Sequence, residues 1–451
     1  MSAQAKRPIG DDAESDEEWR ATRKRPALVQ ATLFPGSVRI SHDMVAGGDV
    51  LRLVSPAFPE FLSTRRGASV PVIAVDFDGT LVTTKPITNA RSGVARPGPR
   101  FPKSASDWAW TFPIVSKKLK SECEARGAVV AILSNQSGAS KSKPAFDLVR
   151  DRFRLVMQSL PKTLPVCTLA SIRKDSVYRK PETGLWTLLV DWLRKDFDIQ
   201  VDASKSIYVG DAAGRPAVSA KRHGKADFAC SDRAFAHNAK IDFMTPEEFF
   251  LGEPAEPFIM HDPVTYLGNR ASLQPVLDKL VGPASPSLEI LLLQAWPGSG
   301  KTTFATAHLS ASHTIVNQDT LASLAKCLKA AEAALSDGKS VCIDNTNANR
   351  AVRAQWVALA KKYPGSTVRV ARFDVDRNLA EHLNCMRGVR FRLGLPLSKP
   401  ALKSVCYHTY AKYYQEPSLD EGFSEIITIP FVPTFEDDHH RQQFLAIYRQ
   451  E

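Results

Sequence analysis

Short apolar runs alternate with helical patterns along most of this chain, and that alternation limits the possible folds more than any other feature. Strands and helices that alternate in this way form βαβ units, whose strands pair in parallel. The first series comprises the apolar runs PVIAVDFD (71–78), VVAILSN (129–135) and KSIYVGD (205–211), with helical patterns at 115–126 and 184–197. A second series begins with the apolar run LEILLLQAW at 288–296. The sequence therefore predicts an α/β fold with parallel sheets.

The length of the chain predicts more than one domain, because 451 residues exceed what a single hydrophobic core usually serves. Proline-rich sequence between the two series marks the expected junction. The beginning of the chain mixes acidic and basic residues with few apolar ones, which is typical of a disordered tail. We expect a disordered charged tail at 1–35, a first domain at 36–255, a junction at 256–287 and a second domain at 288–451.

The composition argues against several classes of protein. The sequence has no apolar stretch near the roughly 18 residues of a membrane span, and its first residues do not resemble a secretory signal. The seven cysteines include no C-x-x-C pair, which indicates a reducing compartment, cytosol or nucleus. The cluster RKRP at 23–26 is either a nuclear import signal or a solvated charge run.

The net charge of +11 belongs to the part of the chain expected to fold, because residues 1–30 hold six acidic and six basic side chains. Such an excess favours a polyanionic partner through contacts with phosphate groups. Many basic proteins bind no nucleic acid, so the charge alone leaves both interpretations open.

Two carboxylates, Asp76 and Asp78, stand at the end of the first apolar run, directly before Gly79 and Thr80. An Asp-Gly turn would explain Asp78 and Gly79 but not Asp76. A bound Mg²⁺ would cancel the repulsion between the two carboxylates, so that one attacks phosphorus while the other handles the proton. The pair therefore favours a phosphoryl-transfer site.

Later parts of the first series supply the other groups that such a site needs. Ser134 and Asn135 end the second apolar run, Lys180 precedes a helical pattern, and Asp211 ends the third run. Hydroxyl, ammonium and carboxylate groups can hold phosphoryl oxygens, neutralise charge and complete a metal site. In this order the residues resemble the four motifs of the haloacid dehalogenase phosphatase superfamily.

The second series opens with PGSGKTTF, which indicates phosphate binding at the start of a helix. Backbone N–H groups in this loop, a lysine ammonium and a threonine hydroxyl would face ATP and Mg²⁺. These residues are Gly298, Ser299, Gly300, Lys301 and Thr302. The usual pattern has glycine where this chain has Ala295, and alanine would strain the loop if that position needs a positive φ. A chance glycine-rich turn is the alternative.

Two further apolar runs of the second series also end on polar side chains. Asp319 follows one run, where a carboxylate can accept the proton of an attacking hydroxyl, although helix-capping aspartates occur at the same place. Asp344, Asn345 and Asn347 follow the next run. They serve either around a metal ion or as hydrogen-bonding groups that shape the loop.

The whole set of motifs resembles the polynucleotide kinase 3′-phosphatase family of DNA end-repair enzymes. The matching segments, between about residues 70 and 432, are DFDGTL, LSNQSG, RKPETGLW, VGDAAGRP, DFACSDRAFA, TPEEFF, PGSGKTTF, NQDTL, IDNTN and EGFSEIITIPF. The resemblance implies a haloacid dehalogenase-like 3′-phosphatase domain followed by a P-loop 5′-kinase domain. It makes Asp76 the nucleophile, Asp78 the general acid–base, and Asp319 the base that activates a 5′-hydroxyl.

The resemblance also assigns the remaining groups and the ligands. Ser134 and Lys180 would hold the phosphate, and Thr80 and Asn135 would lie beside the substrate. Arg215 is expected either to contact a substrate phosphate or to have a structural role. The implied metal-binding residues are Asp76, Asp78, Asp211 and Thr302. The expected cofactors are Mg²⁺ and ATP, and the substrates are DNA ends with a 3′-phosphate or a 5′-hydroxyl. We further expect a nuclear monomer without a membrane association, and other strand-break repair proteins as partners.

Some features depart from the family pattern or leave it incomplete. The short charged tail leaves no room for the forkhead-associated domain of the animal enzymes. Gln318 stands where many relatives have arginine, which puts one phosphate contact in doubt. A lid arginine is expected among Arg387, Arg390 and Arg392.

Two other functions remain open at this point. An RNA end-healing enzyme would need the same chemistry, because nothing in these motifs reads a 2′-hydroxyl. A repair scaffold with an inactive, nucleotide-binding kinase half is the second alternative.

Overall fold

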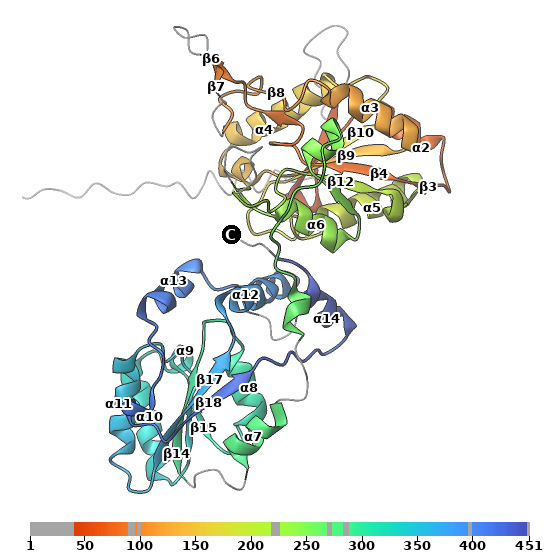
Figure 1. Ribbon diagram of the computed structural model, residues 1–451. Coiled ribbons are helices and arrows are strands. Elements are labelled where there is room, and N and C mark those ends of the chain that lie inside the picture. Colours follow the sequence, from red (N-terminus) through yellow and green to blue (C-terminus); the bar gives the residue numbers. More distant parts are fainter. Residues whose placement is uncertain are drawn as a thin grey trace, which may run out of the picture. The chain divides into compact units, whose positions relative to one another are not determined.

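The computed structural model describes residues 40–88, 95–96, 101–217, 226–267, 273–282, 288–395 and 399–448. The predicted tail, including the RKRP cluster, lies outside these residues. The chain divides into two compact units, Met1–Phe258 and Ile259–Glu451, and each is an α/β structure with parallel strands (Figure 1). The predicted fold class is therefore confirmed.

The first unit is built on a seven-stranded sheet with the order β1-β2-β10-β9-β4-β12-β13. Strand β2 pairs antiparallel with both of its neighbours, and the five strands from β10 to β13 pair in parallel. The strands are β1 (Ser41–Val45), β2 (Val50–Val54), β4 (Val72–Val75), β9 (Val129–Asn135), β10 (Val166–Ser171), β12 (Ile207–Val209) and β13 (Asp242–Met244). Shorter pairs are β3 (Ser69–Val70) with β11 (Gln200–Val201), β5 (Val82–Thr83) with β8 (Ala109–Trp110), and β6 (Ile87–Thr88) with β7 (Ala95–Arg96).

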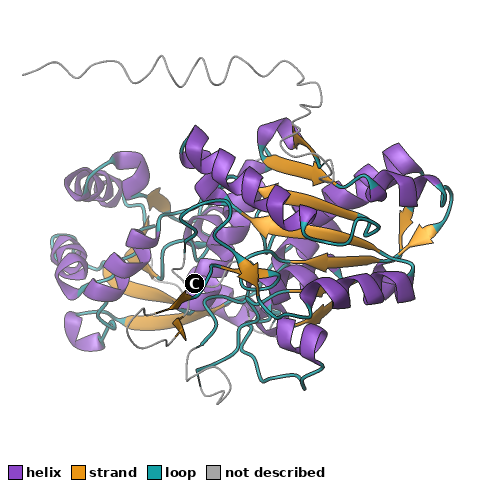
Figure 2. Cartoon of the chain, turned by 90° about the horizontal axis from the view of Figure 1, so that it is seen from above, coloured by secondary structure: helices purple, strands orange, loops and turns teal. Residues whose placement is uncertain are grey.

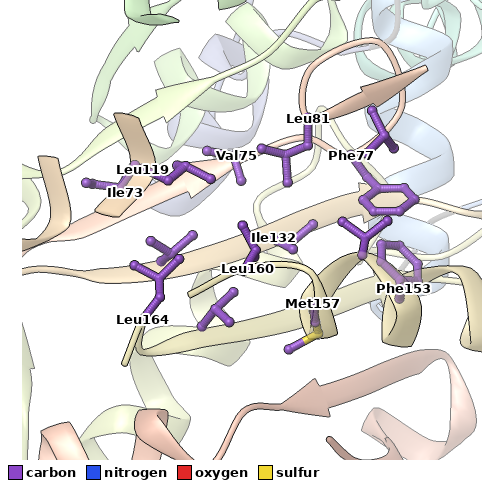
Figure 3. Close-up of a cluster of buried hydrophobic side chains, with 14 of the residues drawn as sticks. Ile73, Val75, Phe77, Leu81, Leu119, Ile132, Phe153, Met157, Leu160 and Leu164 are labelled. Atoms are coloured by element: carbon purple, nitrogen blue, oxygen red, sulfur yellow. The ribbon is translucent and has the colours of Figure 1, made fainter. Parts of the chain in front are cut away.

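Helices cover both faces of this sheet, which explains why its central strands are apolar throughout (Figure 2). Side chains of β4 alternate between two cores: Ile73 and Val75 pack under α3 (Val115–Arg126) and α4 (Lys143–Gln158). Figure 3 shows part of this core. The opposite core contains side chains of α2 (Ala57–Ser63), α5 (Gly184–Phe197) and α6 (Ser231–Ala239). Helices α3 and α5 have the bounds that the sequence predicts.

The second unit contains a five-stranded parallel sheet with the order β15-β16-β14-β17-β18. Its strands are β14 (Glu289–Gln294), β15 (Thr314–Val316), β16 (Val341–Ile343), β17 (Thr367–Asp374) and β18 (Glu425–Pro430). Its helices are α7 (Leu273–Val281), α8 (Lys301–His308), α9 (Gln318–Leu321), α10 (Leu324–Ser336), α11 (Arg350–Ala360), α12 (Arg377–Arg392), α13 (Ser404–Tyr413) and α14 (Asp438–Leu445). Helices α10 and α11 share one core with the sheet, and α7 and α8 share the other.

The boundary between the units falls near the start of the predicted junction at 256–287. Part of that stretch is helix α7, whose Leu280 is buried in the core of the second unit. The proline-rich stretch thus includes a packed helix as well as connecting chain. No helix among the described residues has both the length and the apolar character needed to cross a membrane.

Candidate active sites

The predicted phosphatase residues gather at one edge of the first sheet. Asp76 directly follows β4, Ser134 and Asn135 end β9, and Asp211 follows β12 closely. Strands β9, β4 and β12 are neighbours in the sheet and run in parallel, so their carboxyl ends meet at the same edge. The sequence prediction that these strand ends form one site is consistent with this geometry.

Lys180 lies at the centre of this site, with its side chain almost fully buried. Its Nζ donates hydrogen bonds to Asp76 Oδ1 at 2.6 Å, to Asp232 Oδ1 at 2.7 Å and to Tyr208 Oη at 2.6 Å. Burial alone would lower the pKa of Lys180, but Asp232 and Asp76 raise it above its ordinary value. The ammonium is therefore a fixed positive charge beside Asp76.

Asn135 holds the backbone of Lys180 in place. Its Nδ2 donates to the carbonyl oxygen of Lys180 at 3.0 Å, and its Oδ1 accepts from the Lys180 N–H at 2.9 Å. Both polar atoms of the amide are thus engaged within the protein. Asn135 was predicted beside the substrate, and the structure gives it a positioning role toward Lys180.

Three carboxylates, those of Asp76, Asp211 and Asp232, each offer an oxygen within 4.8 Å of the others. Burial raises the pKa of Asp76 to about 7, and Asp232 adds to this rise against the opposing effect of Lys180. Burial, Asp76 and Asp232 likewise raise the pKa of Asp211 well above its ordinary range. One ammonium cannot balance three carboxylates, and oxygen ligands of this kind suit Mg²⁺. The donor set therefore fits a divalent cation.

Asp232 is the member of this cluster that the sequence analysis missed. It lies in the first turn of α6 and is only 2% exposed. Its segment, DFACSDRAFA, belongs to the motifs that resemble the family. An acidic residue at a helix start usually favours the helix N-terminus, so the sequence gives this position no distinct sign of metal binding.

Gly79 allows the turn after β4 to approach the carboxylate cluster. Its φ is +83°, and a Cβ atom at this position would lie 2.3 Å from Asp211 Oδ2. Any side chain here would both strain the backbone and displace a candidate metal ligand. This contact explains the glycine of the DFDGT motif better than turn formation alone.

The carboxylate of Asp78 is not part of the three-carboxylate cluster, so its expected metal-binding role stays a prediction. Its Oδ1 accepts from Arg152 Nη1, and its Oδ2 accepts from Gln136 Nε2 at 2.7 Å. Strand β4 ends at Val75, and the chain then turns back so that Val82 N–H bonds to Phe77 O. A spacing of two residues therefore no longer places Asp76 and Asp78 on the same face.

The other predicted phosphatase residues are also buried, but their polar atoms differ in their hydrogen-bond partners. Ser134 is 2% exposed, and its Oγ accepts from Gln136 Nε2 at 3.1 Å. The Thr80 hydroxyl is buried without a hydrogen-bond partner among the described residues. Arg215 is fully buried and pairs with Asp227 at 2.9 Å and Glu247 at 2.8 Å. The structure thus favours the structural alternative for Arg215 over a substrate contact.

The loop between β14 and α8 has the backbone geometry expected of a phosphate-binding turn. Gly298 and Gly300 have φ values of +78° and +89°, and Gly300 precedes the first residue of α8. Lys301 is buried, and its Nζ donates to the carbonyl oxygens of Ala295 at 3.3 Å and Trp296 at 2.8 Å. Burial lowers the pKa of Lys301 to about 8, although Asp344 and Asp319 oppose this shift. The loop thus surrounds an ammonium that has no carboxylate in direct contact among the residues that the structure describes.

Thr302 and Asp344 connect this loop to the neighbouring strand β16. Thr302 Oγ1 donates to Asp344 Oδ2 at 2.7 Å, and Asn317 Nδ2 donates to the same oxygen at 2.6 Å. Asp344 is 3% exposed. These oxygens are the groups that could lie around a Mg²⁺ held with ATP phosphates. Asp319, by contrast, is exposed at the start of α9, where its carboxylate is accessible to a substrate hydroxyl.

The structure resolves two questions about the second site. Ala295 is not among the described residues with a positive φ, so alanine does not strain the loop. Asn347 has a φ of 44°, and its Nδ2 donates to Leu293 O at 2.7 Å. Asn345 Oδ1 accepts from the Gln318 N–H at 2.9 Å. The two asparagines therefore shape the loop, as one of the alternatives predicts.

The candidate lid arginines on α12 differ in their contacts. Arg390 donates to Gln443 Oε1 at 3.0 Å and to Glu436 Oε2 at 3.2 Å, which engages its guanidinium within the protein. Arg387 Nε, in contrast, is buried without a hydrogen-bond partner among the described residues. Arg387 thus differs from Arg390 in that this nitrogen atom has no partner in the described part of the chain.

The two sites define a class of protein: a phosphatase of the haloacid dehalogenase type and a P-loop kinase in one chain. Residues 71–250 match the family described as "Polynucleotide kinase 3 phosphatase". The chain is 34% identical over 362 residues to a bifunctional polynucleotide phosphatase/kinase of Schizosaccharomyces pombe, covering 80% of this chain and 79% of the relative. A putative bifunctional polynucleotide phosphatase/kinase of Acanthamoeba polyphaga mimivirus is 30% identical over 353 residues, which cover 73% of this chain and 81% of the relative. The chain belongs to the bifunctional polynucleotide phosphatase/kinase family.

A relative with only the first activity in its name matches a smaller share of the chain. The polynucleotide 3′-phosphatase ZDP of Arabidopsis thaliana is 31% identical over 202 residues, which cover 42% of this chain and 25% of the relative. The similarity to bifunctional relatives, in contrast, extends through both units.

Proposed function

We propose that this protein removes 3′-phosphates from DNA ends and phosphorylates 5′-hydroxyl ends with ATP, so that a ligase can join the break. The observation that carries this proposal is the presence of two complete sets of phosphoryl-transfer groups in two separate units. Lys180, Asp76 and two further carboxylates form the first set, and Lys301, Thr302, Asp344 and Asp319 form the second. The net charge of +11 supports a polyanionic substrate.

In the first site, Asp76 is the proposed nucleophile. One of its carboxylate oxygens attacks phosphorus, the bond from phosphorus to the 3′-oxygen breaks, and Asp78 donates a proton to that oxygen. Water then attacks the aspartyl-phosphate and gives a proton to Asp78, which releases inorganic phosphate and restores Asp76. Lys180 and Ser134 hold the phosphoryl oxygens during both steps. Mg²⁺ held by Asp76, Asp211 and Asp232 would supply charge neutralisation.

In the second site, Asp319 is the proposed base. It accepts the proton of the 5′-hydroxyl, whose oxygen attacks the γ-phosphorus of ATP, and ADP leaves. Backbone N–H groups of the loop from Gly298 to Thr302 bind the phosphates. The ammonium of Lys301 would neutralise charge on the phosphates of bound ATP, and the oxygens of Thr302 and Asp344 would hold Mg²⁺. Of the three candidate lid arginines, we propose Arg387, because its Nε is buried without a hydrogen-bond partner among the described residues, whereas Arg390 is engaged by Gln443 and Glu436.

The decisive experiment uses a gapped DNA duplex with 3′-phosphate and 5′-hydroxyl ends. The aspartyl-phosphate route needs Mg²⁺ but no nucleotide, so phosphate release should proceed without ATP, whereas 5′-phosphorylation should need ATP. EDTA should stop both reactions. Phosphatase activity that persists in EDTA would contradict the metal site. An RNA duplex with the same ends, assayed in parallel, distinguishes the RNA end-healing alternative, and a kinase half that binds ATP without transfer would support the scaffold alternative.

The cellular setting is also a proposal. DNA ends as substrates and the RKRP cluster at 23–26 favour the nucleus, and the two complete sites in one chain favour a monomer that works beside other strand-break repair proteins. Fluorescence microscopy of the tagged chain, with and without RKRP, tests the first statement. Light scattering of the purified protein tests the second.

A further inference from the structure

Arg152 lies beside the phosphatase site, and the mechanism proposed above does not use it. This α4 residue is 3% exposed. Its guanidinium lies 5.0 Å from the centre of the Phe77 ring, and the next residue, Phe153, packs against Phe77 with ring centres 4.1 Å apart. Figure 3 shows Phe77 facing Phe153 across this core. The segment between the two motif carboxylates is therefore packed against α4.

The ion pair of Arg152 differs from those of its neighbours on the same helix. Arg150 and Arg154 both pair with Asp151, an acidic residue of α4 itself, at 3.0 Å and 3.5 Å. Arg152 pairs instead with Asp78, and this is its only ion pair among the described residues. A buried guanidinium costs several kcal/mol to desolvate, and one half-exposed carboxylate repays little of that cost. Fold stability alone therefore explains the position of Arg152 poorly.

Asp78 is held from two sides. Arg152 Nη1 binds its Oδ1, while Gln136 Nε2 binds its Oδ2 at 2.7 Å and also lies 3.1 Å from Ser134 Oγ. The side chain of Asp78 is 49% exposed, so without these donors its carboxylate would rotate freely in water. Proton transfer needs the acid or base within hydrogen-bond reach of the reacting oxygen. A carboxylate that is already held in one orientation loses less rotational freedom on reaching the transition state, which lowers the barrier.

We propose that Arg152 is a positioning residue for Asp78, which holds the proton-transferring carboxylate in its working orientation. This inference rests on the proposed role of Asp78 in the 3′-phosphatase. Arg152 itself transfers no proton and makes no bond to phosphorus. Its effect on the reaction therefore passes through Asp78 and should disappear when Asp78 can no longer transfer a proton.

The first part of the test substitutes Arg152→Met, which keeps an apolar stem of similar length on Phe77. Asp78 is half exposed, so water can solvate it and the variant should fold. We expect kcat for release of 3′-phosphate to fall roughly 10- to 100-fold, because loss of positioning should cost no more than the lower end of the roughly 10²- to 10⁴-fold that a general acid–base group contributes, while KM changes less than about twofold. Arg152→Lys, which restores a charged donor, should recover part of the loss. Arg150→Met is the matched control and should retain wild-type activity.

The second part compares the same substitution in two backgrounds. In an Asp78→Asn protein, assayed at high enzyme concentration, Arg152→Met should cause almost no further loss. An equal fractional loss in both backgrounds would show a general structural effect and would overturn the proposal. A raised KM with unchanged kcat would show a substrate contact and would also overturn it. The 5′-kinase activity of every variant provides a measure of folded protein, and wild-type protein without phosphatase activity would refute the proposed function itself.

Discussion

The two active sites hold their charged groups in opposite ways. In the first unit, Lys180 is surrounded by carboxylates, with Asp76 and Asp232 both within hydrogen-bond distance. In the second unit, Lys301 is also buried, but among the described residues it donates only to neutral carbonyl oxygens, and the proposed base Asp319 is exposed. One site thus gathers more carboxylates than ammonium groups, and the other holds a buried ammonium with no carboxylate partner among the described residues.

Desolvation affects both sites through the same physical rule, because burial disfavours the charged form of any group. It raises the pKa of Asp76 to about 7 and lowers the pKa of Lys301 to about 8. The ligand proposed for each site would bring the opposite charge: a metal cation to the carboxylates and ATP phosphates to the ammonium. Each unit thus contains the groups for its own proposed ligand, and we expect the two sites to work independently.

The largest expected effect is a separation of the two activities. Asp76→Asn keeps the shape of the side chain but removes the nucleophile, so 3′-dephosphorylation should fall roughly 10³-fold or more, while 5′-phosphorylation persists. Lys301→Ala should do the reverse, because it removes the ammonium that steadies the transferring phosphate. Both activities are measured on the same gapped duplex. A well-folded Asp76→Asn protein without either activity would show that the two sites are not independent.

A buried ion pair between Glu289 and Arg369, outside both active sites, can be compared with the carboxylates of the phosphatase site. Glu289 is 1% exposed and accepts from Arg369 through both oxygens at 2.7 Å, and His313 lies 3.0 Å from it. Burial would raise the pKa of Glu289, but hydrogen bonds from Arg369 and His313 lower it below its usual value. The carboxylate of this network thus has a positively charged partner, whereas the carboxylates of the phosphatase cluster outnumber their ammonium.

Arg369→Met should therefore destabilise the second unit by about 3 to 5 kcal/mol, because it leaves a buried carboxylate without its partner. Asp76→Asn, which removes one of several repelling carboxylates, should leave the first unit as stable as before or more stable. Urea unfolding followed separately for each unit measures both effects. Equal destabilisation by the two substitutions would mean that the phosphatase carboxylates are balanced as well.

A smaller effect is expected from Asp232→Asn, which weakens one oxygen ligand and one partner of Lys180. The Mg²⁺ concentration for half-maximal phosphatase activity should rise roughly 10- to 100-fold, as for other groups that support a metal ion. The Mg²⁺ dependence of the kinase provides the control within the same protein. An unchanged phosphatase response would remove Asp232 from the metal site.

The sequence predicts the site residues that lie at the ends of neighbouring strands. It does not predict those that reach the site through packing between distant segments. Parallel strands bring their carboxyl ends together, so Asp76, Ser134 and Asp211 could be placed at one edge without a structure. Asp232 and Arg152 lie on helices, and nothing in their own segments shows that they approach the DFDGT turn. For Asp78, nothing in the local sequence shows that its carboxylate bonds to Gln136 and Arg152, which lie far along the chain.

The smallest expected effect concerns a buried histidine outside both active sites, His382, whose pKa is lowered by desolvation. His382 on α12 is packed against the rings of Phe444 and Tyr448, and its Nε2 lies 2.8 Å from Phe444 O. Burial lowers its pKa to about 4, against the partial opposition of that carbonyl. The unfolded chain, with an ordinary histidine pKa near 6.5, therefore binds a proton that the folded protein does not bind between about pH 4 and 6.5.

Stability should consequently rise with pH across this window and level off above it, because the unfolded state binds more protons there. His382 should contribute about 1 to 2 kcal/mol of the loss in unfolding free energy between pH 7 and pH 5. His382→Gln keeps a donor for Phe444 O but cannot titrate, so its stability should decrease less over the same interval. Urea unfolding of both proteins at the two pH values gives the difference. Identical pH dependence would mean that the His382 ring is protonated in the folded protein as readily as in water, and that burial does not control its charge as it does for Asp76 and Lys301.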